Sequence, residues 1–137
     1  KMQTFLPYSN YVRSAKILDD KRLGKQRVEV FQILNCLAEI RLGWKNHPAV
    51  KMWKGTALGL QFYGMCICKE WVLRGFEDTC YEKIRKFKIK NSQIKPKWLG
   101  SRKFHLSHKS NLIRKQPEYY GKFWEDVPNN LPYYRPV

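Results

Sequence analysis

Acidic residues are scarce in this sequence. Only 11 Asp and Glu stand against 27 Lys and Arg, which gives a formal net charge of +16. An excess of one sign repels itself unless a polyanion lies against it. The imbalance therefore favours nucleic acid as the partner. An anionic membrane surface would require a basic amphipathic helix, a lipidation motif or an apolar span, and we recognise none of these in the sequence.

Long apolar runs, a secretory leader and paired cysteines are also absent. The longest apolar stretches are far shorter than the ~20 residues that cross a bilayer. The opening KMQTFLP lacks the basic-then-apolar order of a secretory signal. We therefore expect an intracellular protein of the cytoplasm, nucleoid or nucleus, or one packaged in a virion. The four cysteines form no CxxC pair, and we interpret them as reduced core residues.

Apolar and aromatic residues are plentiful by contrast. They make up 43% and 15% of the 137 residues, which is far from the composition of a disordered chain. A chain of this length fits one domain with its own core. We expect residues 1–137 to form a single domain, and the protein to be a monomer.

The spacing of apolar residues predicts an all-α fold. Helices are expected from Ser9 or Asn10 to about residue 20, over 21–42, from a cap at 46–48 through 53, over 56–74, and from Ser107 or Ser110 to Pro117. The helix over 56–74 is apolar on most sides, as a surrounded helix is. The prediction is a compact domain of three to four helices around this central helix, with irregular, aromatic-rich connections and tail.

One helical face collects polar groups that could carry chemistry. Arg22, Lys25, Gln26 and Glu29 fall at i, i+3, i+4 and i+7, so they share a face of the helix. Nearby cations keep a carboxylate ionised, which would make Glu29 an anion able to stabilise a developing cation or to handle a proton. The alternative is an ordinary Lys25–Glu29 pair that only supports the helix.

Two further segments could contact nucleic acid. His47 precedes a proline at a predicted helix start, where it is a cap or packs against apolar groups unless it contacts DNA. Trp44 and Trp53 flank this turn among several lysines, and they either stack on bases or pack into the core. His105 and His108 lie one turn apart among cations, which suits phosphate contacts. A zinc site would need further ligands at suitable spacing, and none is evident.

Four stretches resemble the pyrimidine-dimer glycosylase/endonuclease V family, in its bacterial and viral branch. They are MQTFLP at 2–7, KRLGKQRVE at 21–29, NHPAVKMW at 46–53 and SHKSNL at 107–112. The resemblance implies an all-helical domain that kinks DNA, flips a base and cleaves the N-glycosidic bond with an amine nucleophile. The resulting imine then collapses by β-elimination. No metal or cofactor is implied.

The resemblance also assigns roles to residues. In the family the nucleophile is the chain's own α-amino group and its partner is a glutamate. A shared Leu followed six residues later by Glu places that glutamate at Glu29, and the amine falls to Met2 or Lys1. An α-amine suits the role because its pKa of roughly 7.7 to 8.0 leaves a neutral fraction near pH 7.

The sequence thus predicts a DNA repair glycosylase with abasic-site lyase activity that excises a damaged pyrimidine, the expected lesion being a cyclobutane pyrimidine dimer. The predicted partner is double-stranded DNA with a base lesion, without a membrane, and the predicted DNA contacts are Arg22, Lys25, Gln26, Arg27, His47, Lys51, Trp53, Lys54, His105, His108 and Lys109. Two rivals stay open. One is a non-catalytic basic DNA-binding or packaging protein on the same scaffold. The other is an RNA-binding module that prefers single strands.

Overall fold

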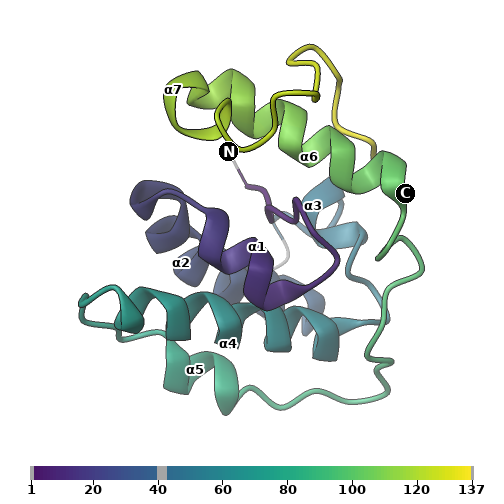
Figure 1. Cartoon of the computed structure of the whole chain (residues 1–137). Helices are drawn as coiled ribbons and strands as arrows, with labels where there is room; N and C mark the ends of the chain where they lie inside the picture. The colour runs from purple at the N-terminus through teal and green to yellow at the C-terminus, as the bar shows by residue number, and fades with distance from the viewer. Residues whose placement is uncertain (1, 40–42, 137) are drawn as a thin grey trace.

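A computed structural model describes residues 2–39 and 43–136 of the chain. In this part the backbone forms seven helices and no strand (Figure 1). The long helices are α2 (Asp20–Leu37), α4 (Ala57–Leu73) and α6 (Arg102–Lys115). The short ones are α1 (Tyr11–Ile17), α3 (Pro48–Lys51), α5 (Tyr81–Arg85) and α7 (Pro117–Tyr120). The all-α prediction is confirmed, and the short helices raise the number above the three to four expected.

The apolar helix α4 lies at the centre, as predicted. It packs against α1, α2 and α5, and Leu60, Tyr63 and Ile67 on it are fully buried. At Gly64 the approach of α2 is so close that an added Cβ would lie 2.5 Å from Cγ1 of Val30. A larger residue would therefore push the two helices apart. None of the helices in the described residues combines the length and apolarity that a bilayer crossing needs.

Four helix boundaries differ from the prediction. Helix α1 ends at Ile17 rather than near residue 20, and α3 ends at Lys51 rather than at residue 53. Helix α2 ends at Leu37 rather than near residue 42, because the chain turns at Glu39, which takes a positive φ of 61°; residues 40–42 lie outside the described residues. Helix α6 begins at Arg102, because Ser101 is its N-cap and accepts a hydrogen bond from Phe104 N–H (3.3 Å). The two serines considered as its cap, Ser107 and Ser110, are instead buried inside the helix.

Other local predictions hold. Asn10 caps α1 and His47 caps α3, each through a side-chain acceptor. Cysteines 36, 68 and 80 are buried and Cys66 is half-buried, and all four are free thiols. The tail after α7 is irregular and aromatic. Trp124 stacks on Tyr120 with ring centroids 5.5 Å apart, which fastens the tail to the helical body.

Candidate active site

The segment before α1, residues 2–7, runs through the interior without helical structure. All six residues are buried, and in Figure 1 the segment passes between α6 and α1. Buried backbone amides and carbonyls must find partners. An extended segment with no neighbouring strand has only side chains to supply them, and side chains from α2, α4 and α6 do so here.

Gln26 of α2 supplies most of these partners. Its Oε1 accepts a hydrogen bond from Phe5 N–H (3.1 Å), and its Nε2 donates to the Gln3 carbonyl (2.6 Å). The same Nε2 donates to Oε1 of Glu29 (2.9 Å). The hydroxyl of Tyr63, on α4, lies 2.6 Å from Gln26 Oε1 and 2.7 Å from the Phe5 carbonyl. One fully buried amide therefore joins the start of the described chain to Glu29.

Two histidines of α6 hold the other side of the segment. His108 Nδ1 accepts a hydrogen bond from Leu6 N–H (3.0 Å), and His105 Nδ1 lies 2.7 Å from the Leu6 carbonyl. His105 Nε2 accepts from Gly100 N–H (2.9 Å), so its proton is on Nδ1. Burial lowers the pKa of His108 to about 3 and also lowers that of His105. Both rings are therefore neutral at pH 7 and act as structural partners of the backbone.

Thr4 is fixed by the core tryptophan. Trp53 is fully buried, and its Nε1 donates to Thr4 Oγ1 (3.1 Å). Its ring stacks on Tyr63 with centroids 6.3 Å apart and meets Trp98 edge-on at 4.9 Å. Trp53 is thus part of the core, and this environment leaves no face of the ring for a base.

Glu29 lies half-buried at the end of this network. Burial raises its pKa above the ordinary value, while the charge of Lys25 and hydrogen bonds from the Gln3 main chain and Gln26 lower it. The net shift is upward, because burial outweighs the charge of Lys25 and these hydrogen bonds. In the described residues Glu29 forms no ion pair with Lys25, and its carboxylate instead accepts a hydrogen bond from Gln26 Nε2. Met2, buried and adjacent to Gln3, brings the start of the described chain to this carboxylate.

Several predicted DNA contacts need correction. Gln26, Trp53, His105 and His108 are all buried, with their polar atoms paired inside the protein. A buried, neutral imidazole does not reach a phosphate on the surface. These four residues position the segment 2–7 instead of facing DNA.

The two arginines predicted to hold phosphates are engaged within the protein. Arg22 pairs with Asp19 (3.2 Å) and donates to Gln116 Oε1 (3.1 Å). Arg27 points to another side of α2, where it pairs with Asp78 (2.7 Å). Because these guanidinium groups already have partners, phosphate contacts through them would compete with the existing bonds.

The other predicted contacts stay on or near the surface. Lys25, Lys51 and Lys54 are exposed. His47 uses Nδ1 to accept from Ala49 N–H (3.0 Å), and burial, followed by the charge of Arg135, lowers its pKa. Lys109 is half-buried over the ring of Tyr8 (4.9 Å). Lys1, the other predicted source of the amine, lies outside the described residues.

Sequence reasoning missed two members of the network, Gln3 and Tyr63. Tyr63 lies 37 positions from Gln26 and 58 from Phe5 in the chain. Its spacing on α4 marks it only as a core aromatic. A polar tip on a buried tyrosine needs a partner, and that requirement is the one signal that could have drawn attention to it.

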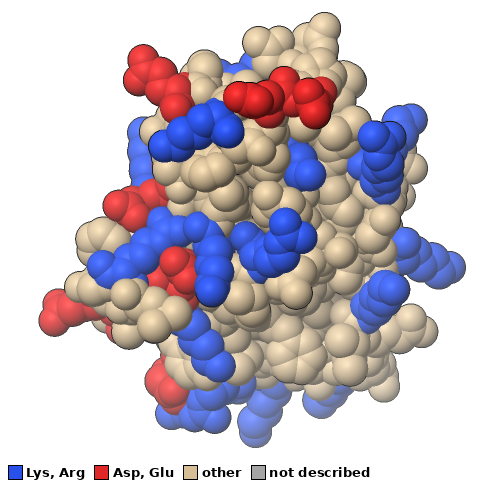
Figure 2. Space-filling view, viewed as in Figure 1, with Lys and Arg blue, Asp and Glu red and all other residues tan. Residues whose placement is uncertain are grey.

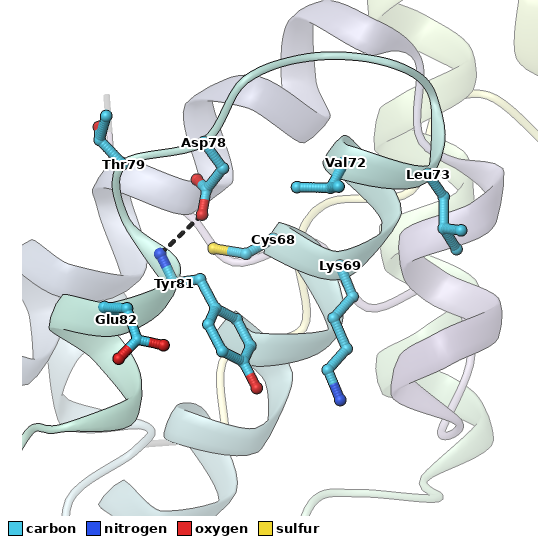
Figure 3. Close-up of a pocket in the computed structure, with 8 residues that line it drawn as sticks. All are labelled: Cys68, Lys69, Val72, Leu73, Asp78, Thr79, Tyr81 and Glu82. Atoms are coloured by element: carbon cyan, nitrogen blue, oxygen red, sulfur yellow. Dashed lines mark hydrogen bonds between the residues drawn. The ribbon is translucent and has the colours of Figure 1, made fainter.

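A separate pocket of about 700 Å³ lies between α4 and α5 (Figure 3). Its walls are mostly apolar, with Cys68, Val72 and Leu73 on one side and Tyr81 on the other. Asp78 at its edge is already engaged, because it accepts from Tyr81 N–H (2.7 Å) and pairs with Arg27. Neither Glu29 nor the segment 2–7 lines this pocket, so it is not where the chemical groups meet.

Comparison with known families places this arrangement in context. A family model described as pyrimidine dimer DNA glycosylase matches residues 2–83. The matched range contains the segment 2–7, the whole of α2 with Gln26 and Glu29, and Tyr63 of α4. Comparisons with curated proteins and with solved structures give no significant match.

Proposed function

The chain belongs to the pyrimidine dimer DNA glycosylase family, and on that premise we propose that it excises a pyrimidine dimer from duplex DNA and cleaves the resulting abasic site through an imine. The observation that supports this most strongly is the hydrogen-bond network in which Gln26 joins the Gln3 carbonyl to the Glu29 carboxylate. An amine at the start of the chain and a carboxylate are the two groups that such a reaction needs.

The proposed nucleophile is the α-amino group of Met2, or of Lys1 where that residue begins the chain. An α-amine titrates near roughly 7.7 to 8.0, so part of it is neutral at pH 7, whereas an ordinary lysine near roughly 10.4 is almost wholly protonated. The nitrogen attacks C1′ of the damaged nucleotide. The glycosidic bond breaks, its electron pair leaves with the base, and the base takes up a proton.

The lyase step follows from the same intermediate. After the amine loses a proton, the sugar ring opens, the ring oxygen is protonated, and a cationic imine joins the nitrogen to C1′. Removal of a C2′ proton then expels the 3′ phosphate, and water hydrolyses the imine to release the enzyme. Each step involves either a positive charge near C1′ or a proton transfer.

Glu29 is the group proposed to serve both needs. As a carboxylate it stabilises the cation that develops at C1′. Its raised pKa brings it closer to the working pH, which favours proton transfer. Gln26 is a positioning residue: it holds Glu29 and the segment 2–7 in one geometry and has no role in the chemistry itself.

Exposed and half-buried cations around this centre are proposed to hold the DNA backbone. Lys25, Lys51, Lys54 and Lys109 are the members of the predicted set whose positions suit phosphate contacts. Three of them are exposed, and Lys109 lies near two further cations, since the charges of Arg13 and Arg102 add to burial in lowering its pKa. The chemistry assigned here uses groups of the chain and of the DNA together with water, and it needs one copy of the chain.

Borohydride reduction tests the proposal, because it converts an imine into a stable covalent adduct. The protein is incubated with one duplex that carries a thymine dimer and another that carries an abasic site. We expect an adduct on both. An adduct on the abasic duplex alone would overturn the assigned lesion, and no adduct on either would favour the non-catalytic DNA-binding alternative.

A further inference from the structure

Four lysines from two separate segments line one groove beside α3. Lys51 and Lys54 lie at the end of α3 and in the turn after it, and Lys95 and Lys97 lie in the segment between α5 and α6. The groove has a volume of about 450 Å³. All four side chains are exposed, and none of the described residues that line the groove is acidic.

Main-chain hydrogen bonds hold the two walls together. On one wall Lys54 N–H donates to the Lys51 carbonyl (3.1 Å), which keeps these two lysines one turn apart. Across the groove Gln93 N–H donates to the Gly55 carbonyl (2.9 Å). The groove is therefore built by the fold and does not depend on side-chain contacts between the lysines.

In the second wall of the groove, exposed lysines alternate with buried residues that anchor the backbone. Lys95 and Lys97 are exposed, whereas Pro96 and Trp98 on either side of Lys97 are buried. Trp98 Nε1 donates to the Met52 carbonyl (2.8 Å), which ties this wall to the residue after α3. The two lysines are thus presented outward from an anchored backbone.

The charges of the groove have no acidic partner among residues 2–39 and 43–136. None of its four lysines forms an ion pair with a carboxylate in the described ranges. The sequence from Lys83 to Pro117 contains no Asp or Glu at all. In Figure 1 the segment between α5 and α6 rises along the right side of the molecule. Figure 2 has the same viewpoint, and on the visible face of this side it shows Lys and Arg but no Asp or Glu. Like charges gathered in this way are stabilised by an anion that sits among them.

The groove also lies beside the candidate active site. Met52 and Pro136 line it, and the same two residues line a small cavity that Gln3 and His108 also border. The groove therefore adjoins the part of the molecule that holds Gln3 of the segment 2–7.

We propose that the four-lysine groove binds backbone phosphates of the duplex on one side of the lesion. This inference rests on the proposed function for the identity of the polyanion, which is double-stranded DNA. It assigns Lys95 and Lys97, which sequence reasoning did not single out, to DNA binding. It also makes the DNA footprint asymmetric about the damaged base, because the groove lies to one side of the Gln3 cavity.

The first test measures the affinity for undamaged duplex DNA as a function of salt concentration. Each phosphate contact contributes about 0.9 to the slope of log affinity against log salt. We expect the double variant Lys95→Gln/Lys97→Gln to lower the magnitude of the slope by about 1 to 2. The control is Lys83→Gln/Lys86→Gln, in α5 and at its C-cap, which removes the same charge elsewhere and is expected to change the slope much less. Equal changes of the slope in the two variants would overturn the proposal that the groove binds phosphates.

The second test uses duplexes that contain a stable abasic-site analogue, with a long flank on one side and a short flank on the other. The wild-type protein should prefer one of the two orientations, and Lys95→Gln/Lys97→Gln should lose that preference. Equal affinity of the wild type for both orientations would overturn the asymmetric footprint. Equal competition by duplex RNA would overturn the assignment to DNA. Neither test requires catalysis. A failed borohydride experiment would therefore not affect the proposal that the groove binds DNA, and a negative result for the groove would not affect the proposed chemistry.

Discussion

Two sides of helix α2 carry polar residues that are neighbours in sequence and separate in space. On one side Gln26 and Glu29 form a network with the segment 2–7, in which Gln26 is fully buried. On another side Arg27 pairs with Asp78 and lies over the ring of Trp71 (4.5 Å). A helix turns by about 100° per residue, so adjacent positions serve unrelated purposes.

The comparison shows that closeness in sequence to a catalytic glutamate does not assign a residue to the site. Arg27 is two residues from Glu29 and anchors the chain before α5, whereas Gln3 is 26 positions away and touches the carboxylate through its main chain. One side of α2 is expected to control chemistry and the other to control stability. Substitutions on the two sides should separate these effects.

The largest effect is expected from Glu29→Gln. Glutamine keeps the oxygen that accepts from Gln26 but loses the charge, so the fold should persist. We expect strand cleavage at a thymine dimer to fall by about 10²- to 10⁴-fold, with duplex affinity nearly unchanged. Single-turnover cleavage rates measure this, with Glu118→Gln, an exposed carboxylate in α7, as the control. A rate within a few-fold of wild type would remove Glu29 from the mechanism.

The next effect is a loss of stability in acid. His108 is neutral in the folded protein with a pKa of about 3, against 6.5 for the unfolded chain. Its contribution is complete above pH 6.5 and is lost as the pH falls toward 3, because only the unfolded state takes up the proton. The full span is up to roughly 5 kcal/mol.

Urea unfolding across this pH range measures the loss. In His108→Asn the amide oxygen can still accept from Leu6 N–H but does not titrate, so the fall in the free energy of unfolding between pH 7 and pH 4 should be smaller than in wild type. His105, whose pKa is also lowered, contributes in the same direction in both proteins. An unchanged pH dependence in His108→Asn would contradict the buried neutral ring.

Gln26→Met tests the inward side of α2. Methionine fills similar space but leaves the Phe5 amide and the Gln3 carbonyl without partners. The free energy of unfolding should fall by about 2–4 kcal/mol, since each unpaired buried group costs about 1–3 kcal/mol. Cleavage per folded molecule should fall as well, because the positioning of Glu29 is lost. Lys21→Met, at an exposed position of α2, is the control for both readouts.

Arg27→Met tests the other side and should give the smallest effect. It removes the ion pair to Asp78, which retains hydrogen bonds from the Cys80 and Tyr81 main chain, so we expect a loss of about 1–3 kcal/mol in unfolding free energy. The rate of cleavage per folded molecule should match wild type. A fall in that rate as large as that of Gln26→Met would erase the distinction between the two sides.

Much of the fold follows from local patterns. The spacing of apolar residues in α4 and the caps at Asn10 and His47 identify helices because each signal lies within one or two turns. Boundaries set elsewhere are harder to predict. Ser107 and Ser110 carry the chemistry of a cap, but they face inward and bind the tail, with Ser110 Oγ accepting from Leu131 N–H (3.0 Å).

The candidate site also contains some residues whose roles can be predicted from the sequence and others whose roles cannot. Glu29 and the start of the chain could be proposed from sequence through the family resemblance. The roles of His105 and His108 could not, because a histidine among lysines looks like a phosphate ligand until its burial is known. The contact from His108 to Leu6 spans 102 positions, and no local pattern encodes it.

The most direct test of the central claim is the identity of the amine that forms the imine. The borohydride adduct on the abasic duplex is digested and the modified peptide is identified by mass spectrometry. We predict modification of the α-amino group at the start of the chain, next to the segment that Gln26 holds against Glu29. Modification of the side chain of an internal lysine, with the α-amine left free, would contradict the account.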